Sequence, residues 1–96
     1  MTDHSKLVLT ISPFAKCGDK ITAFIDAVNV PETVVELFAP DTVVISQPHR
    51  EVVGTGTFKI TITWTVQHVQ KRTPGMVEIT ASADGLVQTG LCKIIR

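Results

Sequence analysis

The sequence predicts an all-β domain whose strands pack as two antiparallel sheets, and two observations support this prediction. Val, Ile and Thr make up 35 of the 96 residues, and such β-branched side chains suit strands better than helices. Within residues 57–67, every second position is apolar, namely Phe58, Ile60, Ile62, Trp64 and Val66. Because successive side chains of a strand point to opposite faces, this alternation indicates a strand with one buried and one solvated face.

The length and the net charge of the chain limit how many domains it can form and which partners it is expected to bind. A chain of 96 residues is long enough for one domain with its own core, and we expect residues 6–96 to form it, after a disordered tail over residues 1–5. Nine basic and nine acidic residues cancel, which leaves no general attraction for nucleic acid. The chain has no apolar run of about 20 residues, so we expect no membrane span.

The first half of the chain predicts four strands. Residues 6–11 form the first, and the break after it contains Pro13 and Gly18. Residues 20–28 favour a second strand, although the spacing of their apolar residues also fits one face of a short helix. A turn over residues 29–32, marked by Pro31, leads to a strand over residues 33–39. After Pro40 and Asp41, residues 42–46 predict a short edge strand.

The second half predicts three more strands. Residues 47–56 contain Pro48 and two glycines and are expected to be irregular, with residues 51–53 as an additional edge strand. The strand over residues 58–66 follows, and then a polar loop over residues 68–75. Residues 76–83 and 86–95 predict a hairpin, because Asp84-Gly85 is a typical two-residue turn.

Seven short strands at regular spacing are typical of an immunoglobulin-like Greek-key sandwich. In many such folds, part of the first strand pairs in parallel with the last strand. This topology would bring Cys17, after the first strand, near Cys92 in the last. A disulfide between them and two free thiols are both open alternatives.

The segment from Pro74 to Leu86 (PGMVEITASADGL) resembles the closing hairpin of bacterial immunoglobulin-like domains. Its features are a Pro-Gly start, an alternating Val-x-Ile-x-Ala strand and an Ala-x-x-Asp-Gly-Leu turn. The close match covers about 20 residues, and the rest agrees only in strand order. The resemblance implies a non-catalytic spacer or adhesion module of a larger bacterial surface or secreted protein.

The chemistry-bearing residues do not form a recognisable catalytic or metal-binding set. His4, His49 and His68 are far apart in the sequence, and nothing places one beside Ser46, Ser82 or Cys17 as nucleophilic catalysis requires. The aspartates lie singly in or beside turns, whereas calcium needs clustered oxygen ligands. We therefore expect no enzyme activity, no cofactor and no metal site.

Edge strands are the expected place for any partner contact, because they present unpaired backbone groups. The residues concerned are Val43, Val44 and Ile45 in one segment and Val52 and Val53 in the other. The expected partners are neighbouring domains of the same chain, with a protein or glycan ligand as a further alternative. A carbohydrate-binding accessory module and a phage virion decoration domain are the rival functions. The first needs an exposed aromatic residue, whereas the parity of Trp64 predicts burial.

Overall fold

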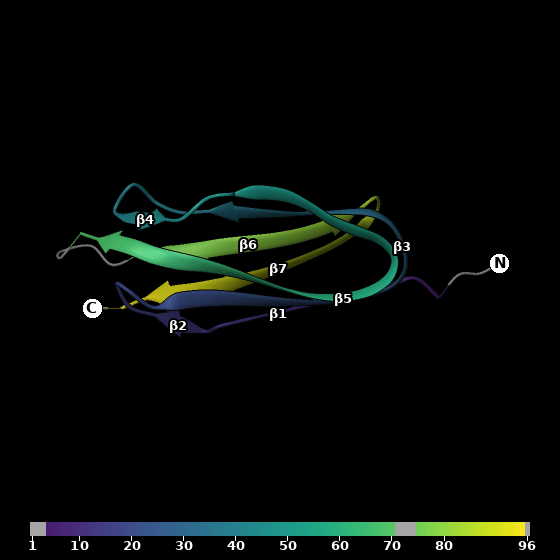
Figure 1. The fold of residues 1–96 in the computed structure, drawn as a ribbon, viewed down its shortest axis with the longest axis horizontal. Helices are drawn as coiled ribbons and strands as arrows, with labels where there is room; N and C mark the ends of the chain where they lie inside the picture. Colours follow the sequence, from purple (N-terminus) through teal and green to yellow (C-terminus); the bar gives the residue numbers. More distant parts are fainter. Residues whose placement is uncertain (1–3, 71–74, 96) are drawn as a thin grey trace.

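The structure is a computed structural model that describes residues 4–70 and 75–95, and this part of the chain is all-β, as predicted (Figure 1). Its strands are β1 (Lys6–Ile11), β2 (Phe14–Ala15), β3 (Lys20–Phe38), β4 (Val43–Ile45), β5 (Arg50–Val69), β6 (Met76–Ala83) and β7 (Leu86–Ile94). Residues 1–3 of the expected tail and 71–74 of the expected loop lie outside the described residues. The second predicted segment is a strand, so the helical alternative is wrong.

The strands form one mixed sheet of seven, in the order β2-β7-β6-β3-β5-β4, with β1 paired to β3 outside this path. All pairs are antiparallel except β2 and β7, which run in parallel. The parallel contact with the last strand was predicted, but β2 itself was not. It is only two residues long and lies in a segment whose proline and glycine indicated a break.

Two long strands turn back on themselves at the same end of the molecule (Figure 1). The first part of β3 pairs with β1 and with the second part of β5, as in Ile25 opposite Leu9 and Ile60. Its second part pairs with the first part of β5 and with β6, as in Val34 opposite Val52 and Ser82. Each long strand therefore pairs with one set of strand segments before its bend and with another set after it.

The predicted turn over residues 29–32 is wrong, because β3 continues through it. Asn29 takes a left-handed conformation (φ 53°), which asparagine tolerates better than most residues. Its N–H donates to Thr57 Oγ1 (3.0 Å), and its carbonyl accepts from Ser5 Oγ (2.7 Å). Side chains thus satisfy the backbone of the bend, and register shifts against β5 absorb its curvature.

The irregular stretch predicted for residues 47–56 is also mostly strand, since β5 begins at Arg50. Gly54 and Gly56 lie at the register shifts. Gly56 has a φ of +89°, and a side chain at Gly54 would approach the Phe58 ring to about 3.0 Å. The glycines therefore bend β5 beside β3, where L side chains would be strained or crowded.

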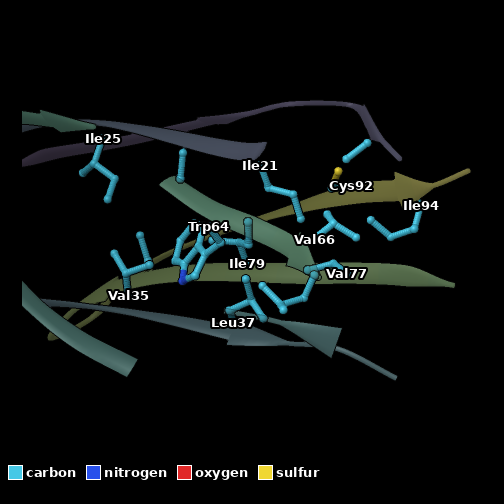
Figure 2. Close-up of a cluster of buried hydrophobic side chains, with 14 of the residues drawn as sticks. Ile21, Ile25, Val35, Leu37, Trp64, Val66, Val77, Ile79, Cys92 and Ile94 are labelled. Atoms are coloured by element: carbon cyan, nitrogen blue, oxygen red, sulfur yellow. The ribbon is translucent and has the colours of Figure 1, made fainter. Parts of the chain in front are cut away.

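Both parts of each long strand contribute to one hydrophobic core. In Figure 2, Ile21 and Ile25 from the first part of β3 lie on the opposite side of Trp64 from Val35 and Leu37 of the second part. Trp64 is 3% exposed, which confirms its predicted core position. Thr33 is polar and buried, and its hydroxyl donates to the Pro31 carbonyl (3.1 Å). The folded sheet thus encloses its apolar residues between its own two parts.

The β6–β7 hairpin agrees most closely with its prediction. β6 has the predicted bounds, and β7 ends one residue earlier than expected. Ala83 pairs with Leu86 across the turn, where Asp84 has a φ of 52°. Local turn chemistry therefore sets the register of the whole hairpin.

Candidate functional site

The two cysteines are free thiols in the structure, one exposed and one buried. Cys17 Sγ donates to the Gln67 carbonyl at 3.6 Å, next to β5 rather than β7. Cys92 is completely buried, and this burial raises the pKa of its thiol. Of the two alternatives from the sequence, the structure therefore contains the free thiols rather than the disulfide.

The first predicted edge segment lies in β4, at one end of the strand order. Val43 and Ile45 are buried, at 5% and 3% exposure, and belong to the core. Val44 points outward and is 45% exposed. Of these three residues, only Val44 can offer its side chain to a partner, because alternate strand residues point to opposite faces.

The second predicted edge segment is the start of β5. Val52 is 51% exposed and pairs with Val34, whereas Val53 is half-buried and packs against the core. Within the described residues, this part of β5 pairs with β3 on one side only. Its other side is the open edge that the sequence predicted.

The residues considered for catalysis bond mainly to the backbone. Ser46 Oγ accepts from the Thr65 N–H (2.8 Å), and His49 Nε2–H donates to the Ile45 carbonyl (2.9 Å). Asp19 Oδ2 accepts from the Lys16 N–H (3.0 Å), which closes a local turn. In the part of the chain that the structure describes, no three His, Cys, Asp or Glu residues gather as metal ligands.

Trp64 is unavailable as a platform for a sugar ring. Its indole lies in the core, and its Nε1–H donates to the Pro48 carbonyl (2.8 Å). This bond joins the second part of β5 to the segment that precedes its first part. The residue has a structural role, which removes Trp64 as the aromatic contact of a carbohydrate-binding module and leaves Phe14, Phe24 and Phe38 as the exposed aromatic residues.

Sequence reasoning missed a surface on which apolar side chains gather. Among residues 4–70 and 75–95, ten large hydrophobic residues are exposed, and the strand registers place six of them on one outer face of the sheet. We call this surface the apolar face. Its six residues are Phe14, Phe38, Val52, Met76, Val87 and Leu91.

The registers set these residues in rows that cross the strands. One row runs from Val52 through Val34 and Ser82 to Val87. Four residues after Val34 on β3, two outward-facing rows away, Phe38 and Leu91 lie on either side of Glu78. At the end of the face, Met76 and Phe14 flank Lys93.

A sequence signal for this face existed in the last strand. Cys92 and Ile94 share one parity, and Val87 and Leu91 share the other. Apolar residues on both parities indicate a strand with two apolar faces, of which the core covers one. The predictions considered only the inward parity.

The face carries equal numbers of basic and acidic side chains. Arg50 Nε lies 3.6 Å from Glu36 Oε2, and both groups are substantially exposed. Lys93 and Glu78 lie between the apolar residues, in adjacent rows. The surface thus combines exposed apolar side chains with two basic and two acidic groups, and the hydroxyls of Thr80 and Thr89 lie 3.3 Å apart between them.

The opposite outer face is formed by β1, the first part of β3 and the second part of β5. We call it the threonine face, because its central rows contain five threonines around Phe24. These are Thr10, Thr22, Thr61, Thr63 and Thr65.

The described chain begins and ends at opposite ends of an elongated molecule. The principal extents are 52 × 17 × 16 Å. Lys6 pairs with Val28, beside the bend of β3, whereas Ile94 pairs with Ala15 at the other end (Figure 1). Neighbouring segments of a longer chain would therefore leave from opposite ends.

No protein-family model matches the chain, and no curated protein matches its sequence. Residues 4–70 and 75–95 contain no helix with the length and apolar character needed to cross a membrane.

Proposed function

We propose that this chain is a non-catalytic spacer or adhesion module of a larger bacterial surface or secreted protein, with an immunoglobulin-like, two-sheet Greek-key arrangement. The observation that carries the proposal is the placement of the first and last strand ends at opposite ends of a molecule 52 Å long. A module with this geometry separates and orients the domains that precede and follow it.

The turned-back long strands support the proposed sandwich. β1, the first part of β3, the second part of β5 and β4 would form one layer. The first part of β5, the second part of β3, β6, β7 and β2 would form the other. The single core between the two sets is what such an arrangement requires.

The pairing of β2 with the last strand, β7, is also arranged to resist tension. Because β2 and β7 are parallel, pulling the chain ends apart draws these strands in opposite directions along their axes. Their pairing includes Lys93 N–H to the Pro13 carbonyl (2.9 Å) and Ile95 N–H to the Ala15 carbonyl (2.8 Å). Such bonds are loaded together rather than one after another, which suits a module that transmits force.

The two rival functions differ from the spacer function in the features that each of them requires. A carbohydrate-binding module would need to use Phe14, Phe24 or Phe38 as its aromatic platform, since Trp64 is buried. A phage virion decoration domain would share this fold and would be found on virus particles. The spacer function is favoured because it depends only on the positions of the two chain ends and needs no ligand.

An immunoblot of the source cells tests the proposal. An antibody against the folded domain should detect a polypeptide larger than 10.4 kDa. That signal should disappear when intact cells are treated with a protease, or it should be found in the medium. A polypeptide of about 10.4 kDa confined to the cell interior would contradict the proposed function, and detection on purified virions would favour the phage alternative.

A further inference from the structure

The apolar face holds its six apolar residues in three rows, and a polar row of Arg50, Glu36, Thr80 and Thr89 lies between the row of Val87 and the row of Leu91. Scattered single exposures are normal for a soluble domain, whereas contiguous apolar patches mark interaction surfaces. Here the six residues of the apolar face are 48–60% exposed and occupy one side of β5, β3, β6, β7 and β2. Three of the other four exposed residues lie on the threonine face, among hydroxyl groups and charges.

We propose that the apolar face binds the same face of a second copy of this chain, so that the module forms a weak two-fold dimer. This inference goes beyond the proposed function, because a spacer needs no self-association. In such an isologous contact, each residue that touches a partner residue is touched in turn by its own copy.

The charges of the face favour a second copy over a partner of strong charge. Arg50 and Lys93 balance Glu36 and Glu78, and the whole chain has a formal charge of zero. Two copies therefore do not repel each other. A two-fold contact can place Glu78 of each copy near Lys93 of the other, because these residues lie in adjacent rows.

The area of the face fits a weak dimer. The face is formed by the first part of β5 (residues 50–54), the second part of β3 (residues 33–38), β6 and β7. About 28 residues with a rise of about 3.3 Å and a strand spacing of about 4.8 Å cover about 440 Å². Two copies would bury about 900 Å² in total, which is the size of a weak or transient interface. We therefore expect an association that depends on concentration rather than an obligate dimer.

Sedimentation equilibrium of the chain between about 10 µM and 1 mM tests the proposal directly. The mean mass should rise from 10.4 kDa towards twice that value. A mass that stays at 10.4 kDa over the whole range would overturn the proposal and leave the face to a different partner.

Three valine-to-lysine variants locate the contact. Val87→Lys, on the apolar face, should raise the dimer Kd by roughly 100-fold, because a charge would be buried on both copies. Val8→Lys, on the threonine face, and Val44→Lys, at the β4 edge, should change it by less than about 2-fold. A dimer that persists in Val87→Lys and is lost in either control would contradict the proposal.

The unmodified chain supplies a measurement that does not depend on variant folding. Cross-saturation between deuterated and protonated copies should attenuate amide signals of β6, β7 and the second part of β3. Attenuation centred on β1 instead would overturn the proposed interface. If Val87→Lys lacks a cooperative unfolding transition, Leu91→Lys serves as the second variant at the same face.

Discussion

The two outer faces of this molecule differ although the same two long strands contribute to both. The threonine face takes its side chains from the first part of β3 and the second part of β5, and hydroxyl groups dominate it. The apolar face takes them from the other parts of these strands together with β6 and β7. Composition alone would miss this contrast, because only register assigns an exposed residue to one face or the other.

The difference between the two faces distinguishes apolar residues that stabilise the fold from apolar residues that are exposed on its surface. Those of the core hold the two parts of the sheet together, whereas those of the apolar face are not needed for folding a single copy. The threonine face, on the other side of the molecule, favours strand formation and is solvated, because threonine suits strands and its hydroxyl hydrogen-bonds to water. The predictions below test this division.

The largest effect should come from the core. Ile79→Ala should lower the free energy of unfolding by about 2–5 kcal/mol, because Ile79 is fully buried in β6. Leu91→Ala, which removes an exposed side chain from the apolar face, should cost less than about 1 kcal/mol. Urea denaturation in dilute solution compares them, and equal losses would contradict the division.

A smaller loss is expected for Trp64→Phe, about 2 kcal/mol. The change removes core volume and the bond from Nε1 to the Pro48 carbonyl, which links the second part of β5 to the segment before β5. Thermal unfolding followed by circular dichroism measures it. A variant as stable as the unmodified chain would show that this link does not matter.

Gly90→Ala should destabilise the domain by about 1 kcal/mol. A Cβ at this position would lie 2.8 Å from Ile11 Cδ1, where β7 faces β1 across the core side. Ile11→Val in the same chain should recover part of the loss, because it shortens the opposing side chain. Chemical denaturation of both variants tests this, and no recovery would indicate that backbone rather than side-chain crowding is responsible.

The smallest effect concerns the buried thiol. Since burial raises the pKa of Cys92, the folded state keeps its proton at pH values where the unfolded chain loses it. The contribution of the buried thiol to stability should be fully present below the unfolded pKa and should be lost as the pH rises above that value towards the folded pKa. Cys92→Ala should lack this loss, whereas Cys17→Ser should retain it. Denaturation curves at each pH distinguish them.

The sequence predicted the fold where local signals decide it. The bounds of β1 and β6, the Asp84-Gly85 hairpin and the burial of Trp64 follow from alternation and turn chemistry. The continuity of β3 through Asn29 did not, because side chains distant in sequence satisfy the backbone of that bend. The apolar face required the register between strands, which no single segment contains.

The account depends most on the two chain ends lying at opposite ends of the module, with β2 and β7 placed to carry tension between them. Single-molecule pulling compares two geometries. In the first, force is applied to the two termini. In the second, it is applied to the N-terminus and to a handle at Asp84, in the β6–β7 turn, which lies at the same end of the molecule as the N-terminus. Both would use a Cys17→Ser, Cys92→Ala background. The account predicts a higher unfolding force for the terminus-to-terminus pull, because its bonds are sheared together rather than peeled apart. An equal or lower force in that geometry would contradict it.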